Sequence, residues 1–344
     1  MSGKALARQE LDFDPARFRA WLNTQLPGLG GEMRVERVGG GQSNPTYFIG
    51  IAGRRFVLRK RPSGDLPRGA HDVAREYLFI SSLAGSGVPV PLPVALNEDP
   101  EVIGAAFYVM ERVDGRIFHD ATLPSAEVGA RRDYYREFAR KLAALHAFDW
   151  ANTPLARLKR PGHYLSRQVE RWAGAWGPWE TVSPEVRRVT DWLRANTPEE
   201  EALAVVHGDF KFTNVIFDPV APRLAAVLDW ELATIGDPMT DVAHIWSALW
   251  ETTQEEYGGL MGSDLRALGL PSSEEFFEAY YEASNSKRRM TPFFLALAHF
   301  RNAGIFHGIG VRAATGNANA ANAAQTGRLD RIYLRRALDI VERN

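Results

Sequence analysis

Cysteine is absent from this 344-residue sequence. Thiol catalysis, thiolate metal sites and disulfide bonds are therefore excluded for the chain. Long apolar runs are also missing, because no stretch reaches the roughly 18 apolar residues that a membrane-spanning helix needs. The first residues, MSGKALARQELDFDPARF, contain no apolar segment of a signal peptide either. We therefore expect a cytoplasmic protein without a membrane segment.

A large net charge is lacking as well. The formal net charge is -1 at pH 7, which argues against a nucleic acid or a membrane surface as the partner. The composition, 45% hydrophobic and 24% charged, is that of an ordinary globular protein. Because 344 residues are too many for one simple core, we expect two lobes or domains.

The sequence pattern changes about one third of the way along the chain. Before that point, strand-like segments flank the glycines of VGGGQSN and the turn in GIAGRR, and a first helix is predicted after a cap at Asp14. Beyond it, apolar residues recur at helical spacing, interrupted by short strand pairs around Asp209 and Asp229. The sequence therefore predicts an α+β protein with a small β-rich lobe, residues 1–112, and a larger α-helical lobe, residues 113–344.

Polar residues lie among apolar, strand-like residues in VVHGDFKFTNVIFDPVAPRLAAVLDWELATIGDPMTD, residues 205–241. Buried carboxylates destabilise a fold unless they are paired, hydrogen-bonded or bound to metal, so this segment is a candidate site. Asn214 stands five residues after Asp209, and Asp229 stands twenty residues after Asp209. This spacing matches the kinase catalytic loop H-x-D-x-x-x-x-N and the metal-binding aspartate after it. Cap and turn residues of a hairpin are the alternative interpretation.

The kinase pattern gives each of these residues a chemical reason. Asp209 would meet the acceptor hydroxyl, while Asn214 and Asp229 would face a Mg²⁺ ion. Magnesium prefers oxygen ligands and usually keeps waters and substrate phosphates, so two protein side chains are sufficient. Asp237 and Asp241 are instead expected to cap and anchor the following helix.

Residues 38–244 resemble the aminoglycoside phosphotransferase and choline kinase superfamily, which has a bilobal, protein-kinase-like fold. Within it, the resemblance is greatest to the phosphotransferase-like domains found alone in bacteria or fused to certain acyl-CoA dehydrogenases. The stretches that carry it are VGGGQSNPTYFI, FVLRKRP, REYLFI, FYVMERVDGRIF, KLAALHAFDW, YLSRQVERW, HGDFKFTNVIFD and VLDWELATIGDPMTDVAH. The resemblance implies an ATP- and magnesium-dependent phosphotransferase that acts on the hydroxyl group of a small molecule.

The resemblance also implies roles for individual residues. Asp209 would be the catalytic base or would orient the acceptor hydroxyl, and His207 would brace the loop by hydrogen bonds. Asn214 and Asp229 would hold magnesium. The glycine-rich turn would cover the nucleotide phosphates with backbone N–H groups, and an ordinary hairpin turn is the alternative. The residues of that turn are Gly40, Gly41, Gln42, Ser43 and Asn44.

A cation is needed beside the phosphates. Aligning FVLR with the kinase pattern V-A-I-K places Arg59 at the lysine position, with Lys60 next to it. Strand alternation sends these two side chains to opposite faces, so only one can reach the phosphates, and we favour Arg59. Glu76 would orient that cation from a helix. Two solvated basic residues on an edge strand, and a surface glutamate, are the alternatives.

Two further segments bear on the nucleotide. FYVMERVDG resembles the strand and hinge between kinase lobes, so the adenine edge would meet backbone groups near Glu111 and Val113. The sequence DWE stands where protein kinases have D-F-G. Without that glycine the segment is less prone to change conformation, which favours a constitutively formed site.

The acceptor class is indicated by charge and by association. Residues 301–336 contain six arginines and one aspartate, a local charge of +5 that suits a hydroxy acid or its CoA thioester. A solvated basic helix face would explain the same residues. The fused dehydrogenase relatives point to a hydroxyacyl-CoA by association. An aminoglycoside, macrolide or choline-type kinase and a catalytically silent nucleotide-binding module are the alternatives.

Aromatic residues also cluster in this chain. Trp172, Trp176 and Trp179 lie in sequence near Tyr164 and Arg167. They could line an acyl or adenine surface, although helix packing would account for them too.

Overall fold

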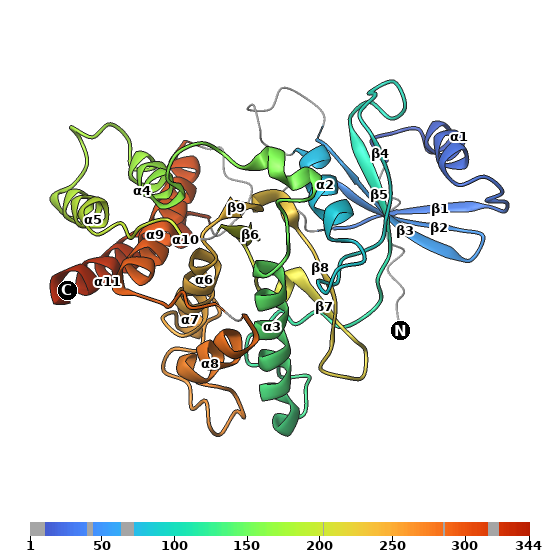
Figure 1. The fold of residues 1–344 in the computed structure, drawn as a ribbon. Coiled ribbons are helices and arrows are strands. Elements are labelled where there is room, and N and C mark those ends of the chain that lie inside the picture. The colour runs from blue at the N-terminus through green and yellow to red at the C-terminus, as the bar shows by residue number, and fades with distance from the viewer. Residues whose placement is uncertain (1–10, 40–43, 63–71, 202, 285, 316–322) are drawn as a thin grey trace. The chain divides into compact units, whose positions relative to one another are not determined.

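The computed structural model describes residues 11–39, 44–62, 72–201, 203–284, 286–315 and 323–344 (Figure 1). Of the predicted nucleotide-binding residues, Gly40, Gly41, Gln42 and Ser43 lie outside the described residues. The chain divides into two compact units, which are described one at a time. Unit 1 contains Met1–Gly85, Pro89–Asp114 and Leu228–Glu231, and unit 2 contains Ser86–Val88, Gly115–Val227 and Leu232–Asn344.

Unit 1 contains a five-stranded antiparallel sheet with the order β1-β2-β3-β5-β4. Its strands are β1 (Met33–Arg37), β2 (Thr46–Ile51), β3 (Arg54–Lys60), β4 (Pro93–Asn97) and β5 (Phe107–Glu111). The loop between β2 and β3 has only two residues, Ala52 and Gly53, both with positive φ. That conformation matches the right-handed twist of a hairpin, and it confirms the turn predicted in GIAGRR.

Two helices accompany this sheet. In α1 (Pro15–Gln25), the Asp14 side chain accepts hydrogen bonds from two backbone N–H groups of the first turn, which confirms the predicted cap. The buried Phe18 and Leu22 of α1 join alternate residues of β2 in one hydrophobic core. The second helix, α2 (Val73–Leu83), buries Glu76 and Phe79.

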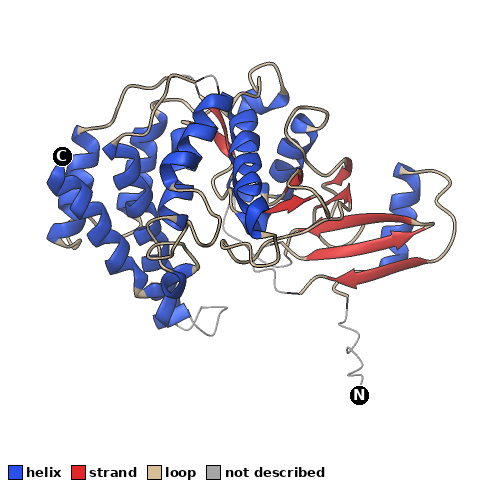
Figure 2. Ribbon diagram, turned by 90° about the horizontal axis from the view of Figure 1, so that it is seen from below, coloured by secondary structure: helices blue, strands red, loops and turns tan. Residues whose placement is uncertain are grey.

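Unit 2 is mostly helical (Figure 2). Its described helices are α3 (Arg131–His146), α4 (Tyr164–Gly174), α5 (Pro184–Ala195), α6 (Met239–Leu249), α7 (Gln254–Tyr257), α8 (Ser273–Ser284), α9 (Pro292–Ala314), α10 (Ala323–Gly327) and α11 (Leu329–Arg343). The helix α9 packs against α6, α10 and α11, and α3 packs against α8.

Two small antiparallel strand pairs interrupt the helices of unit 2. β6 (Ala204–Val206) pairs with β9 (Thr234–Gly236), and β7 (Val215–Phe217) pairs with β8 (Leu224–Val227). The candidate catalytic loop joins β6 to β7 and ends in a short 3-10 turn, Phe212–Asn214. The α+β class is therefore confirmed. No helix within the described ranges is long and apolar enough to cross a membrane.

Candidate active site

The loop between β6 and β7 is fixed by a buried aspartate of α6. The backbone N–H groups of His207 and Gly208 donate to the two carboxylate oxygens of Asp241, at 2.7 and 2.8 Å. Burial alone would raise the pKa of Asp241, but the hydrogen bonds and charge of His146 and His207 hold that pKa below its usual value. Asp241 therefore acts as an anionic clamp on the loop.

Asp237 and Asp241 make different contacts at the start of α6. Asp237 accepts a hydrogen bond from the backbone N–H of Met239, the first residue of α6, at 3.0 Å, but Pro238 occupies the N-cap position itself, where no side chain caps the helix. Asp241 lies inside the first turn and does not cap the helix. It anchors α6 to the catalytic loop instead, with the Nε2 of His146 3.3 Å from the same carboxylate.

Gly208 occupies a position that only glycine fits. Its φ is +81°, and a Cβ there would lie 2.9 Å from the backbone oxygen of Leu232. Its own backbone oxygen accepts a hydrogen bond from the Nη2 of Arg301 in α9. The backbone immediately before Asp209 is therefore tightly determined, and the Nδ1 of the buried His207 accepts a hydrogen bond from the Asp209 N–H at 3.2 Å.

The carboxylate of Asp209 has three polar neighbours in unit 2. The Nδ2 of Asn214 donates to its Oδ2 at 3.0 Å, and the Nζ of Lys211 lies 2.8 Å from the same oxygen. The Nε2 of His244 lies 3.8 Å from Oδ1, which is longer than a direct hydrogen bond. Burial raises the pKa of Asp209, but His244 and Lys211 outweigh it and hold this pKa well below its ordinary value. The group is therefore an anion at neutral pH.

The predicted cation and its helix partner meet in unit 1. Glu76 is buried, and the Nε of Arg59 lies 3.0 Å from its Oε2. Asn44 and Tyr108 donate to the same carboxylate, at 2.5 and 2.9 Å. The Nη2 of Arg59 also lies 3.4 Å from the Oδ1 of Asp229. Burial raises the pKa of Glu76, although Arg59 acts in the opposite direction.

Arg59 and Lys60 point to opposite faces of β3. While Arg59 meets Glu76, the Nζ of the fully buried Lys60 lies 3.0 Å from the Oδ2 of Asp12. This is the alternation expected for adjacent strand residues. Arg59, rather than Lys60, shares a cluster with Asp229.

Asp229 lies in the left-handed region, with a φ of 65°. Aspartate visits this region more readily than most residues, and such strained positions cluster at functional sites. The following Trp230 is fully buried and stacks on Phe79 of α2, with ring centroids 6.0 Å apart. This packing holds the DWE segment against α2.

Asn214 and Asp229 each keep an oxygen available for a metal. No hydrogen bond is made by the Oδ1 of Asn214 or the Oδ2 of Asp229 to any described residue. Hard oxygen atoms of this kind suit Mg²⁺, which needs few protein ligands when phosphates complete its coordination. No cluster of three or more histidine, aspartate or glutamate residues that could hold a metal alone occurs in the described part of the chain.

The hinge segment offers backbone groups. The N–H of Glu111 donates to the backbone oxygen of Leu92 at 2.8 Å, and its side chain pairs with Arg54. The N–H of Val113 makes no hydrogen bond to the described residues. Backbone recognition at this hinge would therefore use the N–H of Val113.

Sequence reasoning did not place several groups beside Asp209. His244 lies three residues after Asp241, so both occupy one face of α6, a spacing that could have revealed it. Arg301 is the only lysine, arginine, aspartate or glutamate in residues 292–311, an isolated charge in an apolar helix. Lys211 stands two residues after Asp209. Only the fold shows that these groups meet.

The tryptophan cluster divides into packing residues and one residue near Arg301. Trp176 stacks on His307, with centroids 4.5 Å apart, and Trp179 carries the guanidinium of Arg194 at 4.7 Å. Trp172 lies 5.8 Å from the guanidinium carbon of Arg301.

The positive charge of the arginines in residues 301–336 is partly neutralised by carboxylates that lie outside that range. Arg335 pairs with Asp339, and Arg336 pairs with Glu256. The local excess of +5 in the sequence therefore does not describe one basic face. Arg301 is the member of the set that contacts the catalytic loop.

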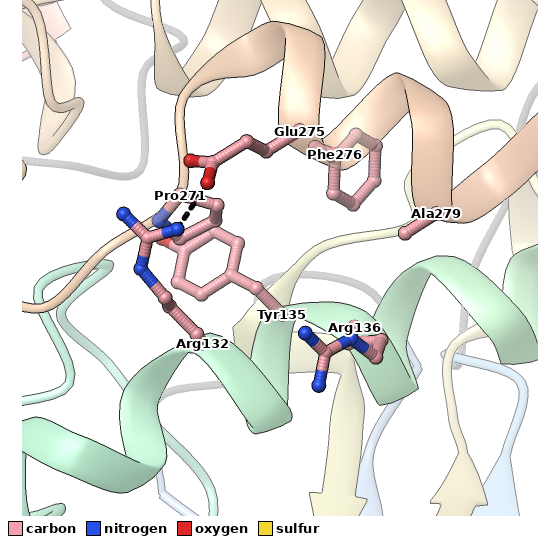
Figure 3. Close-up of a pocket in the computed structure, with 7 residues that line it drawn as sticks. All are labelled: Arg132, Tyr135, Arg136, Pro271, Glu275, Phe276 and Ala279. Carbon is pink, nitrogen blue, oxygen red and sulfur yellow. Dashed lines mark hydrogen bonds and ion pairs between the residues drawn. The ribbon is translucent and has the colours of Figure 1, made fainter.

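A pocket on unit 2 lies between α3 and α8 (Figure 3). None of the predicted site residues lines it, and two of its lining residues, Arg132 and Glu275, form an ion pair. The lining residues are Arg132, Tyr135, Arg136, Pro271, Glu275, Phe276 and Ala279. This pocket is separate from the catalytic loop.

Comparison with known proteins identifies relatives along most of the chain. The model of the phosphotransferase enzyme family matches residues 34–293. The chain is 35% identical over 353 residues to acyl-CoA dehydrogenase family member 11 of Gallus gallus, covering 99% of this chain and 45% of that protein. It spans less than half the length of the relatives named acyl-CoA dehydrogenase family member 10 or 11.

Solved structures show the same fold. A candidate aminoglycoside phosphotransferase from Ralstonia eutropha JMP134 superposes with a TM-score of 0.87 and 36% identity, over 96% of this chain and 99% of that one. Aminoglycoside phosphotransferase APH(4)-Ia, solved with AMP-PNP and hygromycin B, superposes with a TM-score of 0.57 and 18% identity, over 92% and 98% of the two chains. The second likeness concerns the fold alone. The kinase-like fold expected from the sequence is thereby confirmed.

Proposed function

Because this chain belongs to the phosphotransferase enzyme family, we propose that it transfers the γ-phosphoryl group of ATP to a hydroxyl group of a small molecule. The observation that carries this proposal is the anionic Asp209 on a loop whose two preceding residues, His207 and Gly208, are clamped by Asp241. Phosphoryl transfer depends on positioning and electrostatic stabilisation more than on covalent chemistry by the protein. A rigid loop with one fixed carboxylate suits that requirement.

Asp209 would orient the acceptor hydroxyl rather than remove its proton early. A good general base has a pKa near the working pH, whereas the pKa of Asp209 is held well below its ordinary value. Its anion can still accept a hydrogen bond from the hydroxyl. In a loose transition state the proton leaves late, so orientation is the larger contribution.

The nucleotide would be held through its phosphates, its adenine and a bound metal ion. We propose that Arg59, oriented by Glu76, meets the phosphates, with Asn44 and the preceding glycine-rich turn beside them. The adenine edge would meet the backbone of Glu111 and Val113. Asn214 and Asp229 would hold Mg²⁺, through the oxygen that each keeps available. When bound, this ion would neutralise charge on the phosphates.

The acceptor that we propose is a hydroxyacyl-CoA or a hydroxy acid. The relatives named as acyl-CoA dehydrogenases support it, because phosphorylating a hydroxyl creates a leaving group that a dehydrogenase-type partner domain could use. Association with a longer relative is the whole of that support.

An antibiotic kinase is the second candidate, since the Ralstonia relative carries the name of an aminoglycoside phosphotransferase. A choline-type kinase would also fit the fold. A catalytically silent module is disfavoured because Asp209, Asn214 and Asp229 are all present.

A single assay distinguishes these functions. The purified protein is incubated with Mg·ATP and a panel of hydroxyacyl-CoAs, free hydroxy acids, choline and aminoglycosides, and products are identified by mass spectrometry. We expect a phosphorylated hydroxyacyl compound from the wild type and far less of it from Asp209→Asn. A phosphorylated aminoglycoside or choline alone would keep the phosphotransferase assignment and overturn the acceptor. No product, with the same background ATP hydrolysis in both proteins, would contradict phosphotransfer.

A further inference from the structure

Arg301 is a cation beside the catalytic loop that has no carboxylate partner among the described residues. It lies within α9, and its one hydrogen bond to those residues is donated by Nη2 to the backbone oxygen of Gly208. A guanidinium carries five N–H donors, so most of its hydrogen-bonding capacity is unused among the described residues. No carboxylate of those residues lies at ion-pair distance from Arg301.

Two other arginines of unit 2 with little exposure have a carboxylate partner. The side chain of Arg288 is 10% exposed and lies 2.6 Å from Asp237. The side chain of Arg336 is 15% exposed and lies 2.9 Å from Glu256. Charges removed from water are normally compensated in this way, because an unpaired buried charge is costly. Arg131 is also buried without a carboxylate partner in the described part of the chain, but it donates to two backbone oxygens, whereas Arg301 donates to one.

The two carboxylates that act on the charge of Arg301, those of Asp241 and Asp209, bind other groups of the protein. Asp241 accepts from the backbone of the loop and from His146, and Asp209 is bonded to Asn214 and Lys211. Burial lowers the pKa of Arg301, and the negative charges of Asp209 and Asp241 raise it by a smaller amount. An anionic or strongly polar oxygen from outside the protein would therefore meet a guanidinium that still has donors to offer.

A second cation lies near the same aromatic ring. The guanidinium carbon of Arg171 is 4.9 Å from the centroid of the Trp172 ring, and that of Arg301 is 5.8 Å from it. Arg171 is exposed and has no carboxylate at ion-pair distance within the described ranges. Two guanidinium groups around one indole repel each other unless an anion lies nearby. The α4 helix can bring Trp172 this close because Gly304 of α9 has no side chain.

We propose that Arg301, with Arg171 and Trp172, forms the subsite that recognises an acyl oxygen of the acceptor. The inference rests on the proposed function. Gly208, which Arg301 contacts, directly precedes Asp209, and consecutive Cα atoms are about 3.8 Å apart. An acceptor whose hydroxyl meets Asp209 would thus present a nearby carboxylate or thioester oxygen to Arg301. The planar guanidinium matches such oxygens in geometry and charge.

The test measures binding as well as turnover. Three probes share a hydroxyl group: 3-hydroxybutyryl-CoA, 3-hydroxybutyrate and the neutral 1,3-butanediol. Their affinities are measured by calorimetry in the presence of Mg·ADP for the wild type, Arg301→Gln, Arg171→Gln and Arg312→Gln. Arg312 is the matched control, because it is an exposed arginine about three turns further along the same helix. Thermal unfolding and Mg·ATP affinity report any general damage to the loop.

We expect Arg301→Gln to weaken binding of at least one acyl probe by about 10- to 100-fold, the loss of charge-assisted hydrogen bonds. Arg171→Gln, an exposed change that leaves folding intact, should weaken the same probe by a few-fold. The diol and Arg312→Gln should show no change. If only the CoA probe responds, the thioester is the ligand, and if only the free acid responds, the carboxylate is.

Equal binding of the acyl probes to the wild type and Arg301→Gln would overturn the subsite, as would acyl probes that bind no better than the diol. If Arg301→Gln lowers the affinity for the diol as much as the affinity for the acyl probes, Arg301 only holds the backbone of Gly208, and the subsite is wrong. Turnover separates this failure from failure of the proposed function. If phosphoryl transfer occurs equally in the wild type and in Arg301→Gln, the subsite is wrong and the proposed function stands. If acyl binding depends on Arg301 but no phosphoryl transfer occurs, the proposed function is wrong and the subsite stands.

Discussion

At the residue scale, Asp209 and Asp229 have different surroundings. Asp209 is surrounded by Asn214, Lys211 and His244, and its pKa is held well below the ordinary value. Asp229 has a positive φ, lies beside Arg59 and keeps one carboxylate oxygen without a described partner. The first arrangement suits a group that accepts a hydrogen bond, and the second suits a metal ligand.

Asp229→Ala should abolish magnesium-dependent nucleotide binding, because it removes the one carboxylate that we assign to the metal. Titration calorimetry with Mg·ATP measures this directly. Asp99→Ala, an exposed aspartate of the same unit, is the control and should bind normally. Wild-type affinity in Asp229→Ala would contradict the assignment.

At the element scale, α6 organises the centre of unit 2 through residues at helical spacing. Asp241, His244 and Ser247 follow one another at intervals of three along one face. Asp241 holds the catalytic loop, His244 lies near Asp209, and Ser247 contacts His299 of α9 at 2.9 Å. One helix therefore connects the loop to the longest helix of the unit.

Asp241→Asn should lower the free energy of unfolding by about 1–3 kcal/mol, because a buried donor of the loop loses its acceptor. It should also lower kcat, since the loop loses its anchor. Urea denaturation and steady-state kinetics measure the two effects. Asp339→Asn, which breaks an exposed helical ion pair, should change stability by less than about 0.5 kcal/mol. Equal effects of the two substitutions would exclude the clamp.

His299 should make the stability of the fold pH-dependent. Burial, with a smaller effect of Arg336, lowers its pKa from 6.5 to about 3. The unfolded state therefore gains a proton first as the pH falls below about 6.5, and stability declines by at most about 1.4 kcal/mol per pH unit from this group.

Replacing His299 should remove its contribution to the loss of stability at low pH. Urea denaturation between pH 7 and pH 5 should show that His299→Gln loses less stability than the wild type over this interval. His119→Gln, at an exposed position, should follow the wild type. Parallel curves for all three proteins would show that His299 does not titrate as inferred.

The elements defined by short-range patterns were predictable from the sequence, whereas their long-range contacts were not. The cap at Asp14 and the hairpin turn at Gly53 depend only on neighbouring residues, and both were predicted. The contact of Asp241 with Gly208 spans 33 residues, and that of Arg301 with Gly208 spans 93. Periodicity contains no information about such distances along the chain.

At the scale of the whole molecule, each unit contains its own group of candidate site residues. Unit 1 contains the Arg59–Glu76–Asp229 cluster, and unit 2 contains the clamped loop with Asp209 and Asn214. The chain spans less than half the length of its dehydrogenase-named relatives, so the account concerns the phosphotransferase part that they share.

The central claim is that Asp209 positions the acceptor hydroxyl for phosphoryl transfer. The most direct test is the kcat of Asp209→Asn, measured with its Mg·ATP affinity on the acceptor that the panel identifies. We predict a kcat lowered by roughly 10²- to 10⁴-fold, the range for losing a positioned acid–base group, with nucleotide affinity unchanged. Unchanged turnover in this variant would contradict the account.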